Sequence, residues 1–380
     1  MDFALTQDQK MVRDMVREFA VNEIEPIAAE IDESREFPKE TIKKMAGLGL
    51  MGVVIPEEYG GAGMDFTTLA IICEEISRVC ATHGVITAVT NSLCAYPIYH
   101  FGTEEQRKKY LPALTSGKSL GAIGITEPAA GSDPASMETT AVDKGDHYVL
   151  NGTKQWITNA EAADVFVIFA YTDPEERHKG MSAFIVEKDH EGFSIGKHEN
   201  LMGIRATGNC ELIMDDCKVP KENLLGGEGN GFKVVMHTLD VSRIDIGAQG
   251  VGISQGALDA AAKYAKEREQ FGRPIGKFEM VQDMIAQMAA QTDAARLLVY
   301  RAASLKDGGA ERFTREAAIA KYFAAETAVA VTRMAVQIHG GNGYSKEYAV
   351  ERMYRDAKIV EIYEGTSQIQ KIVIARETLR

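Results

Sequence analysis

The spacing of apolar positions changes twice along the chain and divides it into three zones. Residues 1–120 have helical spacing: Thr6 and Gln9 form a capping box, and residues 66–79 are an apolar helical run. Residues 121–230 hold short strand-like runs, and residues 231–380 return to long amphipathic segments. We therefore expect an α+β multi-domain chain with an N-terminal helical domain, a middle β domain and a C-terminal helical domain.

The middle zone is predicted to be antiparallel. Turn residues at 143–146 and at Asn151-Gly152 flank a short strand, and strand-like runs follow at 165–171, 181–186 and 211–214. Because no helical run separates these strands, the pattern does not suggest the alternating order of a Rossmann sheet. A small antiparallel barrel or sandwich is the simplest arrangement.

The C-terminal zone is predicted to be a four-helix bundle. Its long helical segments are separated by glycine-containing breaks at 271–276, 307–309 and 339–343, and short connections favour antiparallel neighbours. The glycine-rich segment 226–231 has no βαβ unit around it and does not predict a dinucleotide fold. A nucleotide cofactor would have to be held in another way.

The net charge and the cysteines indicate which binding partners and which cellular compartment to expect. The net charge of −13 argues against nucleic acid or an anionic membrane as the main partner. The five cysteines include no C-x-x-C pair, and their odd number predicts reduced thiols instead of a disulfide framework. We expect no metal site, because no histidine or cysteine pair has a ligand spacing. Without a leader or a long apolar run, we expect a soluble cytoplasmic protein.

Two segments of the middle zone suit a planar ligand. Trp156, the only tryptophan, and Thr158 would place a flat π-face and a hydroxyl on one side of a strand. Such a pair can stack on a heterocycle and donate to a ring nitrogen. In the loop 123–132, Thr126 and Ser132 can donate to phosphate or ring oxygens. A lone tryptophan is more often a core residue, so this interpretation depends on both segments.

Two carboxylates near the C-terminus are candidates for acid–base chemistry. Glu361 and Glu364 are three residues apart, a spacing that puts both on one helix face. Glu364 follows Ile362 and Tyr363 and precedes Gly365, where the helix should break. A carboxylate at such a break can project into a pocket, and desolvation would raise its pKa toward that of a general base. The more common outcome for such a pair is two solvated carboxylates.

Six short motifs follow one another along the chain. They are Ile125-Thr-Glu-Pro128, Trp156-Ile-Thr158, Met202-Gly-Ile-Arg205, Arg268-x-x-Phe-Gly272, Gln337-Ile-His-Gly-Gly341 and Ile362-Tyr-Glu-Gly-Thr366. Together they resemble the acyl-CoA dehydrogenases over essentially the whole chain, in order and without a large insertion. The chain most resembles the bacterial short-chain, or butyryl-CoA, branch of that family.

The resemblance implies three domains and an FAD cofactor. The domains are expected at 1–120, 121–230 and 231–380, with FAD between a middle β-barrel and a C-terminal four-helix bundle. The expected cofactor-binding residues are Ile123, Ile125, Thr126, Gly131, Ser132, Trp156, Ile157, Thr158, Arg268, Phe271, Gln337, Ile338, Gly340, Gly341, Thr366, Ser367 and Gln368. Arg268 and the loop 337–341 would come from a neighbouring subunit, so a homotetramer arranged as a dimer of dimers is expected.

The resemblance also implies a reaction. Glu364 is expected to remove the α-proton of a short-chain acyl-CoA while the β-hydride passes to flavin N5, which gives the trans-2-enoyl-CoA. The backbone N–H of Glu364 and a flavin ribityl hydroxyl would polarise the thioester carbonyl. Electrons would then pass to an electron-transferring flavoprotein. Residues 91–96 are expected at the floor of the acyl pocket. The expected substrate-binding residues are Ser132, Asp240, Arg243 and Gly365.

A comparison with the family pattern bears on the base, and two departures from the pattern bear on the substrate and on FAD. Some branches carry the base immediately before the arginine that Arg243 matches, but here that position is Ser242, which cannot act as a base. Val241 and Ser242 replace two small residues beside the acyl channel. A substrate whose acyl group differs from butyryl in size or shape therefore stays an open alternative. Glu279 stands where relatives usually have a glutamine that contacts FAD, and is not an expected cofactor residue.

Other functions stay open at this point. The reverse reaction would make the chain an enoyl-CoA reductase coupled to an electron-transferring flavoprotein, acting on an unsaturated, aromatic or alicyclic acyl-CoA. An acyl-CoA oxidase is a weaker alternative, since those chains are typically longer. A non-catalytic FAD or acyl-CoA binding protein belongs to another class, and Glu364 beside intact flavin-loop motifs counts against it. Neither the direction of the reaction nor membership of an electron-bifurcating complex follows from the sequence.

Overall fold

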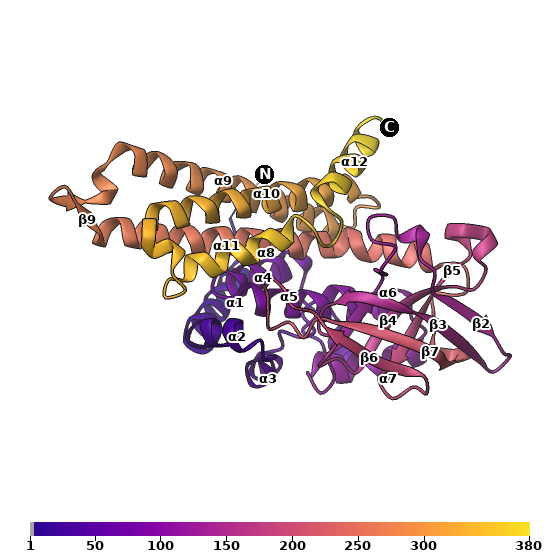
Figure 1. Ribbon diagram of the computed structural model, residues 1–380. Coiled ribbons are helices and arrows are strands. Elements are labelled where there is room, and N and C mark those ends of the chain that lie inside the picture. The colour runs from indigo at the N-terminus through magenta and orange to yellow at the C-terminus, as the bar shows by residue number, and fades with distance from the viewer. Residues whose placement is uncertain (1–3) are drawn as a thin grey trace.

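The computed structural model describes residues 4–380. In Figure 1 the chain runs from helices (indigo to purple), through a sheet (magenta), to a bundle of long helices (orange to yellow). The predicted order of a helical, a β and a second helical part is confirmed.

The N-terminal part is helical because its apolar residues recur at helical spacing and its helix starts are capped. The predicted capping box is present: Gln9 N–H donates to Thr6 Oγ1 over 3.1 Å, and Thr6 N–H donates to Gln9 Oε1 over 3.0 Å. Every residue of α5 is buried, so this helix lies inside the protein instead of on its surface. The helices of this part are α1 (Gln7–Phe19), α2 (Ala28–Ser34), α3 (Lys39–Gly47), α4 (Phe66–Ser77), α5 (Ala81–Ala88), α6 (Tyr96–Phe101) and α7 (Glu104–Thr115), and the π-helical segment η4 (Val89–Ala95) continues α5.

The middle part is one open sheet with the strand order β6-β7-β3-β2-β4-β5-β8, in which β1 also pairs with β4. The seven residues of β4 are an unbroken apolar and aromatic run and are all buried, as expected for a strand covered on both faces. The strands are β1 (Gly121–Gly124), β2 (Thr140–Asp143), β3 (His147–Ile157), β4 (Val165–Tyr171), β5 (Met181–Glu187), β6 (Phe193–His198), β7 (Cys210–Pro220) and β8 (Leu224–Leu225).

The prediction of an antiparallel barrel is not confirmed. The end strands β6 and β8 do not pair with each other within residues 4–380, so the sheet does not close. Strand β4 pairs in parallel with both β1 and β2, and therefore the sheet is mixed. The turn predicted at 143–146 is present, with Gly145 N–H donating to Asp143 Oδ1 over 2.7 Å.

The turn predicted at Asn151-Gly152 is wrong, because these residues form a bulge inside β3. The register of β3 against β7 shifts between Leu150 and Gly152. Gly152 has φ +150°, and a Cβ there would lie 2.4 Å from Thr139 Oγ1. A glycine is needed where the strand bends over its neighbour.

The C-terminal part is a helical bundle whose expected fourth long helix is divided in two. The helices are α8 (Gly231–Glu267), α9 (Glu279–Asp307), α10 (Thr314–His339), α11 (Ala349–Val360) and α12 (Ser367–Thr378). The hairpin of β9 (Glu269–Gln270) and β10 (Arg273–Pro274) joins α8 to α9 at the end of the bundle far from the sheet (Figure 1). Helices α8 and α10 approach closely at Gly250, where a Cβ would lie 3.0 Å from the carbonyl oxygen of Ala324.

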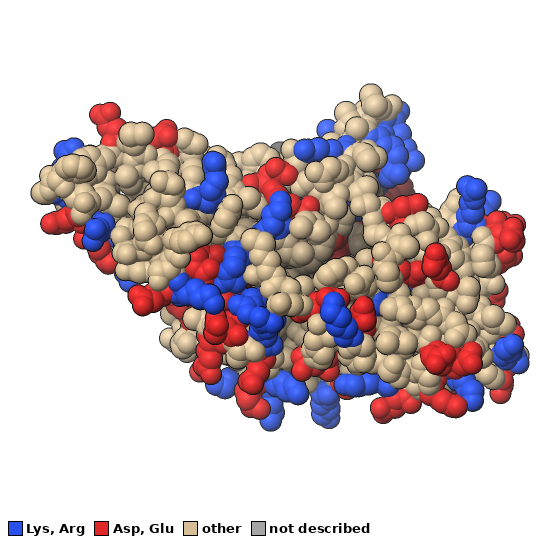
Figure 2. Space-filling view, in the orientation of Figure 1, with Lys and Arg blue, Asp and Glu red and all other residues tan. Residues whose placement is uncertain are grey.

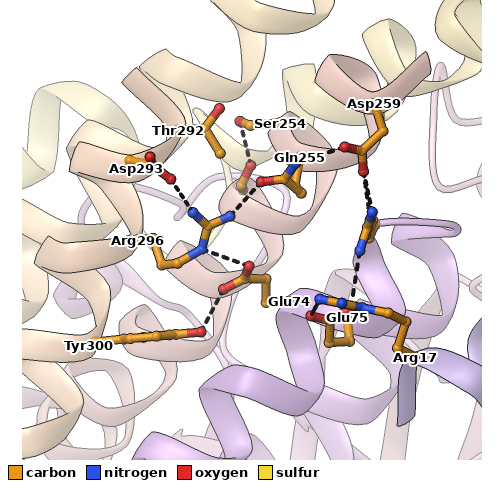
Figure 3. Close-up of polar contacts among 12 residues, drawn as sticks. Arg17, Glu74, Glu75, Ser254, Gln255, Asp259, Thr292, Asp293, Arg296 and Tyr300 are labelled. Atoms are coloured by element: carbon orange, nitrogen blue, oxygen red, sulfur yellow. Dashed lines mark hydrogen bonds and ion pairs between the residues drawn. The ribbon is translucent and has the colours of Figure 1, made fainter. Parts of the chain in front are cut away.

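One largely buried and one partly exposed ion pair fix the N-terminal helices to the bundle (Figure 3). Glu74 of α4 accepts hydrogen bonds from Arg296 Nε over 2.8 Å and from the Tyr300 hydroxyl over 2.9 Å, both on α9. Burial raises the pKa of Glu74, and the Arg296 charge opposes this shift. A second pair joins Arg78 to Asp259 of α8. These contacts hold α4 against α8 and α9 and so orient the helices beside it.

Within residues 4–380, none of the helices combines the length and apolar character that a membrane crossing requires.

We predict that Glu74→Ala lowers the free energy of unfolding by about 3 kcal/mol, because it removes the buried carboxylate that Arg296 and Tyr300 both contact. Among residues 4–380, the mostly buried Arg296 charge then has only the 73% exposed Asp293 carboxylate as an acidic partner. Denaturant unfolding at constant protein concentration measures the change. Glu33→Ala is the matched control, since Glu33 and its partner Lys346 have side chains 66% and 65% exposed, and such a pair contributes at most about 1 kcal/mol. Equal losses in the two variants would contradict the structural role given to Glu74.

Candidate active site

A cavity of about 510 Å³ lies among the sheet, α5, η4, α8 and the turn between α11 and α12. The face of the molecule shown in Figure 2 is hollowed near its centre, below α12. Glu364 and Gly365 line this cavity, as do many of the predicted cofactor-binding residues. Those that line it are Ile123, Ile125, Thr126, Gly131, Ser132, Trp156, Ile157, Thr158 and Thr366.

Trp156 reaches the cavity through an irregular strand end. Its φ is +63° and its side chain is 51% exposed, and the register of β3 against β7 shifts between Lys154 and Ile157. Trp156 and Thr158 both line the cavity, as predicted, but a left-handed residue directs them there instead of regular strand alternation. Such a conformation is costly for a bulky side chain and is typical of functional sites.

The loop after β1 is fixed to β3 by a buried ion pair. Lys154 is fully buried, and its Nζ lies 2.6 Å from Glu127 Oε1. Burial lowers the pKa of Lys154 to about 8, and the Glu127 carboxylate opposes this shift. Gln155 N–H also donates to the Thr126 carbonyl over 2.8 Å. The loop and the Trp156 segment are thus held together on one side of the cavity.

Glu364 and Gly365 form a left-handed turn on the opposite side. Their φ angles are +56° and +88°. Gln370 Nε2 donates to the carbonyl oxygens of both residues, each over 2.9 Å, and Lys321 Nζ donates to the Gly365 carbonyl over 2.7 Å. The predicted helix break is present, but α11 already ends at Val360. Because the break comes before Glu364, the two carboxylates do not share a helix face.

The Glu364 carboxylate is held in partly apolar surroundings. Ser242 Oγ of α8 donates to Glu364 Oε2 over 2.5 Å. Burial raises the pKa of Glu364, while the Ser242 hydrogen bond and the charges of Arg243 and Lys321 oppose the rise. Burial also lowers the pKa of Lys321 to about 7. A carboxylate whose pKa is raised, and which faces a cavity, is suited to removing a proton.

Three comparisons with known proteins agree on the family. The profiles described as the N-terminal, middle and C-terminal domains of acyl-CoA dehydrogenase match residues 6–118, 122–217 and 229–379. The short-chain specific acyl-CoA dehydrogenase of Clostridium acetobutylicum is 54% identical over 380 residues, which cover all of both chains. The chain belongs to the acyl-CoA dehydrogenase family.

Two further relatives extend the comparison. The acryloyl-CoA reductase (NADH) of Anaerotignum propionicum is 51% identical and is matched over all of this chain and 96% of its own. A solved structure from work on the electron transferring flavoprotein of Acidaminococcus fermentans and flavin-based electron bifurcation overlays with a TM-score of 0.99. It is 51% identical, and the match covers all of both chains. The chain is therefore a flavin-dependent oxidoreductase of this family.

The apolar wall of the cavity was not fully predicted. Val85, Val89 and Leu93 line it at a spacing of four residues along α5 and η4. Because every residue of these two segments is buried, the sequence pattern does not distinguish the face that meets the cavity. Of residues 91–96, expected at the floor of the pocket, only Leu93 lines the cavity. Asn91 instead accepts from Val53 N–H over 2.7 Å and supports the chain before α4.

Some predicted residues lie beside the cavity without lining it. Asp240 and Arg243 form a pair on α8 whose oxygen and nitrogen are 2.7 Å apart, and Thr314 Oγ1 donates to Asp240 over 2.5 Å. Ser367 is buried at the start of α12, whereas Gln368 is exposed. These residues adjoin Ser242 and Thr366, which contact or line the site.

The remaining predicted residues lie at the far end of the bundle. Arg268 follows α8, and 22 residues of helix separate it from Ile246 in the cavity wall, a distance of about 33 Å at 1.5 Å per residue. Phe271 in the hairpin is 93% exposed and has φ +51°. Gln337, Gly340 and Gly341 are exposed and Ile338 is buried at the end of α10 and in the turn after it. One chain does not bring these residues to its own cavity.

We predict that Gly365→Ala lowers the free energy of unfolding by about 2 kcal/mol more than Gly309→Ala. Both glycines have positive φ, so both variants carry the strain of a left-handed alanine. Only at Gly365 would the added Cβ meet a neighbour, 2.7 Å from Gln370 Nε2, and displacing this amide breaks two hydrogen bonds. Denaturant unfolding of the two variants makes the comparison, and equal losses would mean that Gln370 does not hold the turn.

Proposed function

We propose that this chain catalyses the FAD-dependent α,β-dehydrogenation of a short-chain acyl-CoA to the trans-2-enoyl-CoA, with Glu364 as the base. The observation that carries the proposal is the position of the Glu364 carboxylate, whose pKa burial raises. It lines the same cavity as Trp156, Thr158 and Thr126. A proton acceptor and a platform for a planar ring thus line the same cavity.

The donors around the cavity fit an FAD ring. Thr126, Ser132, Thr158 and Thr366 supply hydroxyl groups, and Trp156 supplies an exposed aromatic face. Asn209 Oδ1 at the cavity and Ser367 Oγ beside it are buried without a hydrogen-bond partner within residues 4–380. Unpartnered buried polar atoms favour a polar ligand at this position. When bound, FAD supplies the acceptor for the β-hydride.

The chain's own groups carry the proton transfer. Glu364 takes the α-proton onto its carboxylate, and its backbone N–H donates to the thioester oxygen as negative charge develops there. The apolar side chains of Val85, Val89 and Ile246 exclude water and keep the carboxylate poorly solvated. We place Ser132, Asp240, Arg243 and Gly365 at the acyl-CoA. The short-chain class rests on the resemblance and on the relative from C. acetobutylicum, which is described as short-chain specific.

Partners and assembly are part of the proposal. The distance of about 33 Å between Ile246 and Arg268 favours a neighbouring subunit as the source of Arg268, Phe271 and the loop 337–341. We therefore propose a homotetramer in which each FAD contacts two chains. The solved structure from work on an electron transferring flavoprotein supports such a flavoprotein as the electron acceptor. Five free, buried cysteines agree with a reducing compartment, and we propose the cytoplasm.

The reverse reaction is a second candidate, because the relative from A. propionicum is described as an acryloyl-CoA reductase. An enoyl-CoA reductase would use the same groups in the opposite sense, with Glu364 returning a proton to Cα. Pre-reduced enzyme mixed with enoyl-CoA tests this direction. Reoxidation by an enoyl-CoA that exceeds the rate of reduction by the matching acyl-CoA would favour the reductase.

We predict that Glu364→Gln slows flavin reduction by acyl-CoA at least a thousandfold, because an amide cannot take the α-proton. Anaerobic bleaching of the flavin absorbance by a panel of acyl-CoAs measures the rate and identifies the substrate class. Glu361→Gln is the control, since Glu361 does not line the cavity. Unchanged bleaching in Glu364→Gln would rule out Glu364 as the base, and a purified protein without flavin would reject the whole proposal.

We predict that Arg268→Ala weakens FAD binding about tenfold or more, through the loss of a charged contact contributed by the neighbouring subunit. The exposed Lys266, in the last turn of α8, provides the control variant Lys266→Ala. Titration of the apoprotein with FAD, followed by flavin fluorescence, gives both affinities. Equal affinities in the two variants would argue against Arg268 as a cofactor residue.

A further inference from the structure

Helix α8 presents one hydroxyl group to the carboxylate of Glu364. Ser242 is fully buried, and its Oγ lies 2.5 Å from Glu364 Oε2 and 3.3 Å from the Leu239 carbonyl oxygen. A hydroxyl has one proton and can donate it to only one of these acceptors. The carboxylate is the closer and, when ionised, the stronger acceptor. The geometry therefore favours donation to Glu364 over a bond within the helix.

In the described part of the chain, four other titratable groups lie near Glu364 without a hydrogen bond to its carboxylate, and of these Arg243 and Lys321 oppose the rise of its pKa. Arg243 and Asp245 approach from α8, Lys321 approaches from α10, and Tyr363 precedes Glu364 in the chain. Arg243 Nη1 is bonded to Asp240, and Lys321 Nζ is bonded to the Gly365 carbonyl. Within residues 4–380, Ser242 provides the one hydrogen bond that this carboxylate accepts.

The two ends of the Glu364 residue are thus held by different helices. Gln370 of α12 holds the backbone carbonyl, and Ser242 of α8 holds the tip of the side chain. The side chain between them has rotatable bonds and no second polar anchor among the residues that the structure describes. Without the Ser242 hydroxyl, the direction of the carboxylate would depend on packing alone.

We propose that Ser242 is a positioning residue, which aims the Glu364 carboxylate into the cavity and stabilises its ionised form. The inference rests on the proposed function, in which Glu364 is the base. Ser242 thereby takes part in the reaction, although its hydroxyl cannot itself act as the base. The alternative is a purely structural role, in which the hydroxyl of a buried serine donates to a backbone carbonyl one turn earlier in the same helix.

The test is the pH dependence of flavin reduction by acyl-CoA in the FAD-loaded enzyme, measured by anaerobic stopped flow. Removing the hydroxyl removes a hydrogen bond that favours the ionised carboxylate, so the pKa of Glu364 rises. The rate falls on the acid side, where Glu364 is protonated. We expect Ser242→Ala to move the acid limb of the profile upward by about one pH unit, which is a tenfold lower rate below that limb.

Three further variants separate positioning from a structural role. Ser242→Thr keeps the hydroxyl and should restore the wild-type limb, whereas Ser242→Gly lacks it and should shift like Ser242→Ala. Ser254→Ala is the matched control: Ser254 is also fully buried on α8, but its Oγ donates to the Gly250 carbonyl over 2.8 Å. This control should leave the limb unchanged.

The outcomes distinguish the inference from the function on which it rests. Glu364→Gln can abolish flavin reduction while Ser242→Ala and Ser242→Gly keep the wild-type acid limb. In that case the proposed role of Ser242 is wrong, and the assignment of Glu364 as the base is supported. An equal shift in Ser254→Ala would also overturn the inference. If Glu364→Gln reduces flavin at the wild-type rate, the proposed base itself fails.

Discussion

The turn between α11 and α12 places an ionisable carboxylate against an apolar wall. Water is the better solvent for this group, and the protein replaces it with one hydroxyl from α8 and two nearby cations. The turn itself has a left-handed backbone, which three side-chain hydrogen bonds from α10 and α12 hold in place. Three helices of the bundle, α8, α10 and α12, therefore support this one strained turn.

On the other side of the cavity, the sheet fixes the segments that face the ligand space. Its central strand β4 is buried along its whole length, and β3 leaves the regular register just before Trp156. The pair of Lys154 and Glu127 joins the loop after β1 to β3, so both segments that face the cavity are fixed to the same rigid element. The ion pair of Glu74 with Arg296 holds α4 against α9, and α5 follows α4 in the chain. Three parts of the chain thus meet at one cavity.

Much of this arrangement could be predicted from the sequence because the responsible signals are local. The capping box at Thr6 and Gln9 and the apolar runs of β4 and β5 depend on neighbours in the chain, and all were predicted. Trp156, Thr158 and Glu364 were predicted from residue type and from resemblance, and the structure brings them to one cavity. Local chemistry and family motifs were sufficient at these positions.

The features that were missed depend on distant parts of the chain. The bulge at Gly152 requires β7 as a partner, and the same Asn-Gly pair would form a turn in an isolated hairpin. The open, mixed sheet follows from the pairing of β4 with β1 and β2, which no local pattern encodes. Glu361 and Glu364 have helical spacing, but α11 ends before Glu364 because side chains from α10 and α12 stabilise a different backbone there.

The left-handed conformation of Glu364 also has an evolutionary consequence. A non-glycine residue at φ +56° costs roughly 1 kcal/mol or more, and burying the carboxylate adds to that cost. A glycine at this position would remove both costs, so the most stable sequence for this backbone is not the active one. Selection for folding alone would favour glycine at this position, and the presence of glutamate in this chain is a sign of selection for chemistry. Chains of this fold that have lost their activity are therefore expected to lose this glutamate early, and to gain stability as they do so.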